Sequence, residues 1–197
     1  MPSSHWLQIN EIVSAIIATN PKSLLDIGAG FGKYGVLARE YLELWDGRNQ
    51  YKNWKRRIDG IEIFDSYVNP LYKIYNNVFI GNAIDILKKN STGYDLILLI
   101  DVLEHFTQGE GKELLQLCKI RGRNVLIATP HVPSSQKSAF GNEHETHKSK
   151  WRAEDIETYG NKFIIENSKS LICFVGESAS IVYNKIRKHE FRMSKRD

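Results

Sequence analysis

LLDIGAGFGKYG, residues 24–35, is the stretch of sequence that decides the fold. An apolar run over residues 23–27 breaks into closely spaced glycines, and apolar residues at helical spacing follow from Lys33 onward. Glycine permits positive φ angles and close backbone approach, and the first turn of a helix presents unpaired amides at its positive end. The stretch therefore predicts a strand, a tight turn and a helix that together bind a nucleotide-type ligand.

Strand-like apolar runs alternate with helix-like segments over the rest of the chain. We expect strands over residues 23–27, 58–63, 78–80, 94–100 and 124–128. We expect helices over residues 6–18, 33–45, 66–75, 83–89, 111–118 and 152–159. Two further β runs, 163–167 (extending toward 175) and 180–183, are predicted to form an antiparallel hairpin at one sheet edge. This order predicts an α/β fold, a Rossmann-like seven-stranded, mainly parallel sheet with helices on both faces.

Length and composition indicate one domain. The chain has 197 residues, of which 42% are hydrophobic and 11% aromatic, enough to bury a substantial core. We expect a single domain over residues 1–197, with a leading helix at 6–18 and a basic tail at 187–197. Cys118 and Cys173 lie in apolar contexts and predict buried thiols. No leader pattern is visible and no apolar run approaches about 18 residues, so we expect a soluble, cytoplasmic protein without a membrane partner.

The glycine pattern by itself fits two ligands. Residues 30–35, GFGKYG, also match the G-x-G-x-x-G of dinucleotide-binding proteins. Two features favour an adenosyl donor: Asp26 precedes the first glycine by two positions, and Glu62 ends the second predicted strand. A carboxylate there can accept hydrogen bonds from both ribose hydroxyls, although a dehydrogenase uses the same position for NAD. An NAD oxidoreductase therefore remains the weakest alternative.

With these motifs, residues 24–159 resemble the class I S-adenosylmethionine (SAM)-dependent methyltransferases. The resemblance implies SAM as the cofactor. It implies that Gly28, Gly30 and Gly32, with Ala29 between them, surround the methionine portion and the ribose of SAM.

Five further residues of the cofactor site follow from the same resemblance. Asp26 would orient the glycine turn or meet the amino group, and Glu62, with Ile63 next to it, would hold the ribose. Asn82 and Ala83 would lie beside the adenine. The family often has Asp where this chain has Asn82.

Residues 101–106, DVLEHF, follow the predicted central strand and resemble the D/E-V-L-E-H segment of small-molecule and ubiquinone-type methyltransferases. This segment separates the family from NAD enzymes and adds Asp101 to the predicted cofactor site. The resemblance implies an enzyme that transfers a methyl group from SAM to a small-molecule acceptor, at oxygen.

Methyl transfer from a sulfonium is an in-line displacement, so the enzyme must mainly align donor and acceptor. An oxygen acceptor also benefits from a general base, and histidine has a suitable pKa. The candidates are His105, His131, His144 and His147, of which the last three lie in a long polar loop over residues 130–150 that is a candidate substrate loop. We select His105 and His147, with Asp101, as catalytic residues.

The set Asp101, Glu104, His105 and His147 is also a candidate divalent-metal site, since such side chains can converge at a strand end. The pattern resembles that of the RNA 3′-terminal 2′-O-methyltransferases, which carry E-x-x-E-H and a later histidine before an aromatic residue. Here Asp101 replaces the first Glu of that pattern. A bound metal is the less favoured interpretation. In the favoured one, Glu104 and His105 support the turn and His147 forms hydrogen bonds within its loop.

Besides the NAD oxidoreductase, which is the fourth and weakest alternative, three function classes stay open. The first is methyl transfer to a small molecule, and the second is an RNA methyltransferase with a divalent-metal site. The net charge of +4 and the basic tail allow nucleic-acid binding without favouring it. The third is a non-catalytic SAM-binding module, because a glycine turn establishes binding and not turnover. The residues specify neither the acceptor nor the oligomeric state.

Overall fold

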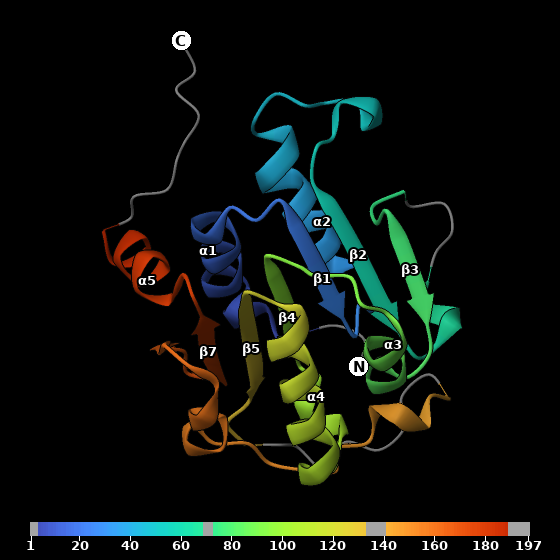
Figure 1. Cartoon of the computed structure of the whole chain (residues 1–197), viewed down its shortest axis with the longest axis vertical. Helices are drawn as coiled ribbons and strands as arrows, with labels where there is room; N and C mark the ends of the chain where they lie inside the picture. The colour runs from blue at the N-terminus through green and yellow to red at the C-terminus, as the bar shows by residue number, and fades with distance from the viewer. Residues whose placement is uncertain (1–3, 69–72, 133–140, 189–197) are drawn as a thin grey trace.

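A computed structural model describes residues 4–68, 73–132 and 141–188, which form a seven-stranded sheet covered by helices on both faces (Figure 1). The strands are β1 (Ser23–Ile27), β2 (Arg57–Glu62), β3 (Asn77–Ile80), β4 (Leu96–Ile100), β5 (Asn124–Pro130), β6 (Lys162–Ile165) and β7 (Ser170–Gly176). Their order is β3-β2-β1-β4-β5-β7-β6. Strands β1 to β5 run parallel, and β7 is antiparallel to both β5 and β6. The predicted fold class is confirmed.

The helices form two layers. They are α1 (Ile9–Thr19), α2 (Lys33–Arg39), α3 (Ala83–Lys89), α4 (Gln108–Arg121) and α5 (Ala179–Arg187). Helices α3 and α4 cover the near face of the sheet in Figure 1, whereas α1, α2 and α5 pack on the other face. Successive strand side chains point to opposite faces, so Leu25 and Ile97 join the first layer while Leu24 and Leu96 join the second.

The central strand β4 explains where a ligand can bind. All five of its residues are buried, as its continuous apolar sequence predicts. It lies between β1 and β5, and the strand order reverses between β1 and β4. In open α/β sheets, ligands bind in the crevice beyond the carboxyl ends of the strands at this reversal. The glycine turn after β1 and the segment after β4 both lie at that edge.

The helix predicted over residues 66–75 is wrong. Residues 65–67 form a single 3-10 turn, residues 73–76 form turns and bends, and residues 69–72 lie outside the described part of the chain. The sequence reason is the proline at position 70, which lacks an amide and disfavours helical backbone at the residue before it.

The strand predicted over residues 180–183 is also wrong, because this segment lies inside α5. Ala179 and Val182 are buried three positions apart, and Ile186 packs on the same cluster, so the apolar spacing is helical. The predicted antiparallel hairpin exists, but β6 and β7 form it. The predicted helix over residues 33–45 is α2 followed by a π-helical segment, Glu40–Leu44, and the predicted 152–159 helix is a 3-10 helix, Ala153–Tyr159.

Both cysteines, Cys118 and Cys173, are buried free thiols, as expected. Among the helices of the described residues, none is both long and apolar enough to cross a lipid bilayer.

Candidate functional site

The glycine turn has the backbone conformation that its sequence predicts. Gly28, Gly30 and Gly32 have φ angles of 69°, 55° and 84°, a region that residues with a side chain rarely adopt. A Cβ on Gly28 would also lie 2.7 Å from Cγ2 of Val102. The backbone therefore requires glycine here, for conformation and for close packing.

Glu62, at the end of β2, is buried against this turn. Its Oε2 accepts a 2.8 Å hydrogen bond from the Gly30 amide, and its Oε1 accepts one of 2.9 Å from the Phe64 amide. Burial raises the pKa of Glu62, and these amides partly offset that effect. The carboxylate is thus fixed at the place where the sequence predicts a ribose-binding group.

Asp26 lies behind the turn. Its Oδ2 accepts a 2.6 Å hydrogen bond from the Tyr75 hydroxyl, and burial raises its pKa to about 7. Asp26 is not among the residues that line the cavity described next. Of the two predicted roles for Asp26, this position favours orientation of the turn.

A cavity of about 330 Å³ opens beside the turn, within the size range of small-molecule sites. It is lined by these predicted cofactor residues: Gly28, Ala29, Gly30, Glu62, Ile63, Asn82, Ala83 and Asp101. Gly32 and Asp26 are the predicted members that do not line it. Asn82 is also the N-cap of α3, where its Oδ1 accepts a 2.8 Å hydrogen bond from the Ile84 amide.

Asp101 follows β4 in a strained conformation. Its φ angle is +54°, in the left-handed region, and its amide donates to the Ala128 carbonyl at 2.8 Å. Its Oδ2 accepts a 2.7 Å hydrogen bond from Nε2 of Gln8. Burial raises the pKa of Asp101. Strain of this kind persists only where the surrounding structure holds it, and it is typical of functional sites.

The chain brings His147 to the end of β4 through backbone contacts. The amides of Lys148 and Ser149 both donate to the Glu104 carbonyl, at 2.7 and 3.1 Å. The indole of the buried Trp151 donates to the Leu103 carbonyl at 3.0 Å. These bonds fix the segment against the 3-10 turn Leu103–His105, so that the sequence-distant imidazole can meet that turn.

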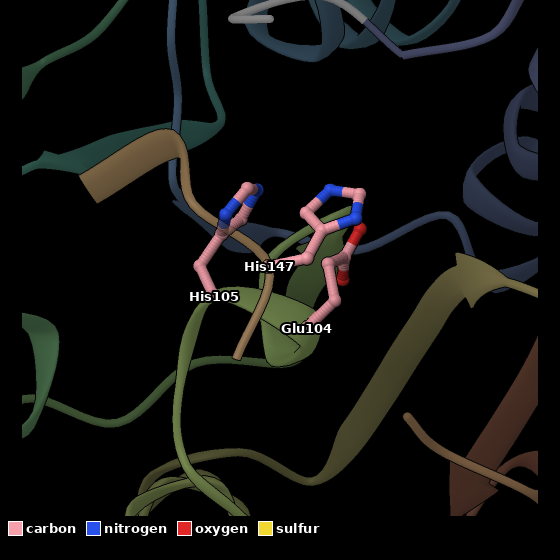
Figure 2. Close-up of side chains that lie close together, drawn as sticks. All are labelled: Glu104, His105 and His147. Atoms are coloured by element: carbon pink, nitrogen blue, oxygen red, sulfur yellow. The ribbon is translucent and has the colours of Figure 1, made fainter. Parts of the chain in front are cut away.

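Three residues of the predicted metal set converge. Figure 2 shows Glu104 and His105 extending from the 3-10 turn, with His147 beside them, and ligating atoms of all three lie within 4.8 Å of one another. The His105 and His147 ring centroids are 5.0 Å apart. Asp101 is not a member of this group.

Burial sets the protonation states of Glu104 and His105, and a divalent cation would have to displace the proton of Glu104. Burial raises the pKa of Glu104 to about 8 and lowers the pKa of His105 to about 4, so His105 is a neutral imidazole near pH 7. Nδ1 of His105 lies 3.3 Å from the Thr146 carbonyl, which orients the ring and leaves Nε2 as the acceptor nitrogen. One carboxylate and two imidazoles suit manganese or zinc better than magnesium.

The four candidate histidines differ in their position relative to the cavity. His105 and His144 line the cavity, and His147 lies next to His105. His131 does not line it, and its Nε2 lies 3.0 Å from the Asn167 carbonyl. His131 is therefore removed from the set of candidate bases.

Several cavity residues were not predicted. Tyr67, Asn142 and Glu145 line the cavity, and the Tyr67 hydroxyl donates to Oε1 of Glu145 at 3.1 Å. Tyr67 also packs edge-on against Phe31 and Phe64. The long polar loop over residues 130–150 was a sequence signal for Asn142 and Glu145, and none marked Tyr67. The described part of this loop contributes to the cavity wall, and its residues 133–140 lie outside the described residues.

No family model and no curated protein sequence matches the chain, but solved structures match its fold. The N-terminal domain of EvdMO1, crystallised with S-adenosylhomocysteine (SAH) and D-fucose, has a TM-score of 0.61 at 14% identity, over 88% of this chain and 84% of that chain. The methyltransferase domain of bacterial CtHen1 has a TM-score of 0.57 at 16% identity, over 87% and 98%.

An O-methyltransferase family protein from Burkholderia thailandensis has a TM-score of 0.57 at 12% identity, over 86% of this chain. This chain spans only 56% of that protein's length. The fold is therefore that of the SAM-dependent methyltransferases, as the sequence resemblance predicts.

Proposed function

We propose that this chain is a SAM-dependent methyltransferase that transfers a methyl group to an oxygen atom of a small-molecule acceptor. One observation carries the proposal: the same cavity is lined by Gly28 and Glu62 of the predicted donor site and by Asp101 and His105 of the predicted transfer site. A single cavity of this kind can hold a donor beside its acceptor and exclude water from both.

The described residues fit the donor. The turn at Gly28 and Gly30 leaves backbone without side chains facing the cavity. Glu62 uses one lone pair of each carboxylate oxygen on backbone amides, which leaves lone pairs for ribose hydroxyls. The EvdMO1 domain, which shares the fold, was crystallised with SAH. We therefore place the ribose at Glu62 and the adenine near Asn82 and Ala83.

When bound, SAM supplies a methyl group on a positively charged sulfur. The chain aligns the acceptor oxygen and takes its proton. His105 fits the role of base because its imidazole is neutral and its Nε2 is free to accept a proton, while Nδ1 faces the Thr146 carbonyl. His147 and Asp101 are the neighbouring groups that can help to position or relay that proton.

The proposal is tested by mass spectrometry of ligand retained on purification, followed by a screen of hydroxylated small molecules with labelled SAM. We expect retained SAM or SAH and labelled product with an oxygen-linked methyl group. With that acceptor, H105A should lower kcat by about 10²- to 10⁴-fold, and H131A, outside the cavity, should not. SAH binding without turnover of any acceptor would instead identify a non-catalytic module.

A second candidate function, metal-dependent methylation of an RNA hydroxyl, is favoured by the convergence of Glu104, His105 and His147. A cation held by these residues would supply electrostatic stabilisation of an acceptor oxygen. Titration of a short RNA at several salt concentrations, with Mn²⁺ or EDTA, distinguishes the two. Binding that falls steeply with salt and needs Mn²⁺ supports the RNA acceptor, because phosphate contacts release counterions. Absence of RNA binding at low salt rules it out.

A further inference from the structure

Two opposite charges line the cavity next to the glycine turn. Lys33 is the first residue of α2, and Asp101 follows β4. Burial lowers the pKa of Lys33, and the neighbouring Asp101 opposes this effect. A pair of this kind presents a cation and an anion to one ligand, which is the pattern that a zwitterion requires.

One short segment of the chain holds both charges. The Lys33 ammonium donates to the Ser4 carbonyl at 2.8 Å, and Nε2 of Gln8 donates to Oδ2 of Asp101 at 2.7 Å. Residues 4–8 thus contact both groups from one side. Ser4 itself lines the cavity.

The segment is in turn fixed to the body of the protein. The Asn167 amide Nδ2 donates to the Leu7 carbonyl at 2.9 Å, across 160 positions of sequence. Nδ1 of His5 accepts from the Leu7 amide at 3.2 Å and caps the 3-10 turn Trp6–Gln8. Residues 4–8 are therefore an ordered part of the cavity wall.

Gln8 is completely buried and faces two cavity-lining residues. Its side chain interacts with the hydroxyl of Tyr34 as well as with the carboxylate of Asp101. A buried amide between two such groups holds both in place, because leaving either of its polar ends without a partner would cost free energy. The amide nitrogen of the same Gln8 side chain is the atom that donates to Asp101.

We infer that residues 4–8 belong to the donor site, where they hold Lys33 and Asp101 as a charge pair that binds the zwitterionic amino-acid end of the donor. The ammonium of that end binds Asp101, and its carboxylate binds Lys33. Gln8 is a positioning residue that fixes the Asp101 carboxylate. This inference rests on the proposed function.

The test compares two ligands by calorimetry. SAH carries the amino-acid end, and 5′-methylthioadenosine shares its adenosine but lacks that end. We expect Q8M, which keeps the length of the side chain but removes its amide, to weaken SAH binding about tenfold, the size of one charge-assisted hydrogen bond. Binding of 5′-methylthioadenosine should stay unchanged. Q116M, which makes the same substitution at an exposed residue of α4 that does not line the cavity, is the matched control and should bind both ligands as the wild type does.

A second variant, K33M, removes the other charge and should weaken SAH with the same selectivity; it decides the question if Q8M does not fold. Wild-type affinity of both variants for SAH would overturn the inference, and so would an equal loss for the two ligands, which indicates a general structural role. A wild-type protein that binds neither ligand would contradict the proposed function itself, and this outcome is distinct from the others.

Discussion

The Tyr75 hydroxyl donates a 2.6 Å hydrogen bond to Oδ2 of Asp26, across 49 positions of sequence. The Tyr75 ring fills the space that a side chain would need at Gly35 and packs against the backbone of Gly60. A Cβ on Gly35 would lie 2.4 Å from Cζ of the ring, and one on Gly60 would lie 3.4 Å from the ring. The ring therefore connects α2, β2 and the strand before the glycine turn behind the cavity.

This packing predicts that G35A is destabilising, although Gly35 lies inside a helix where alanine is normally the better residue. The added methyl group must displace a partly buried ring, at a cost of about 1 to 3 kcal/mol. G109A is the matched control, because Gly109 lies in α4 and a Cβ there would meet nothing within 4 Å beyond its own helix. Chemical denaturation should show a loss for G35A and a neutral or stabilising effect for G109A.

The loss of stability caused by G35A should disappear when the Tyr75 ring is absent. In a double-mutant cycle, G35A introduced into Y75A should cost much less than G35A alone. Equal costs in both backgrounds would contradict the assigned contact.

The buried Asp26 predicts a pH-dependent stability difference. Its pKa is about 7 in the folded protein against 3.8 for an ordinary aspartate, so between these values the folded state binds the proton that the unfolded state has lost. The contribution of Asp26 to stability therefore falls as pH rises from about 4 to 7. D26N has no such proton. The free energy of unfolding of D26N minus that of the wild type should therefore increase between pH 5 and pH 8, by on the order of a few kcal/mol. The Tm of D26N relative to wild type should increase with it.

Asp85, an exposed residue of α3, provides the control. The Tm difference between D85N and wild type should change little over the same range. A D26N difference that is constant with pH would show that Asp26 is ionised throughout in the folded protein.

Substitution of Gly28 should affect both stability and SAH binding, whereas substitution of Gly47 should affect stability alone. G28A and G47A both place alanine at a positive φ angle, 69° and 80°, and each should lose about 1 to 2 kcal/mol of stability through the backbone alone, to which G28A adds the contact with Val102. Only Gly28 lines the cavity and packs on Val102. SAH binding measured by calorimetry should therefore weaken in G28A and remain at the wild-type level in G47A. Equal affinities would place the donor elsewhere.

These relationships show which parts of the structure the sequence can predict. The glycine turn was predictable because Gly28, Gly30 and Gly32 report a local backbone requirement, and the buried strand β4 because its apolar run is continuous. The segments over 66–75 and 180–183 were assigned wrongly, since a proline interrupts the first and β-branched residues disguise the helical spacing of the second.

The candidate site was predictable only where its residues belong to local motifs. These motif residues follow the ends of strands, and the parallel sheet brings those ends together. Tyr75, Gln8 and Glu145 reach the site through contacts across 49, 93 and 78 positions, and no local pattern marks such contacts. The convergence of His147 with Glu104 likewise depends on backbone hydrogen bonds that the sequence does not reveal.

The cluster of Glu104, His105 and His147 predicts a proton-coupled metal site. Because the pKa of Glu104 is about 8 without a cation, Mn²⁺ binding at pH 7 should release a proton, and the affinity should rise with pH toward 8. Calorimetry in buffers of different ionisation enthalpy measures this release. E104Q resembles the protonated form, so it should keep the fold and lose the metal.

The control for metal binding is H131A, since His131 neither lines the cavity nor belongs to the cluster of Glu104, His105 and His147. H131A should bind Mn²⁺ as the wild type does, whereas H147A should bind it weakly. Failure of the wild-type protein to bind Mn²⁺ or Zn²⁺ after EDTA dialysis would contradict the metal site. His105 and His147 would then act without a metal ion.

The central claim is that the glycine turn and Glu62 hold the adenosyl part of SAM. Parallel titration of the purified chain with SAH and with NADH tests it most directly. We predict saturable binding of SAH, weakened in G28A, and no binding of NADH. Binding of NADH in place of SAH, or binding of neither, would contradict the claim.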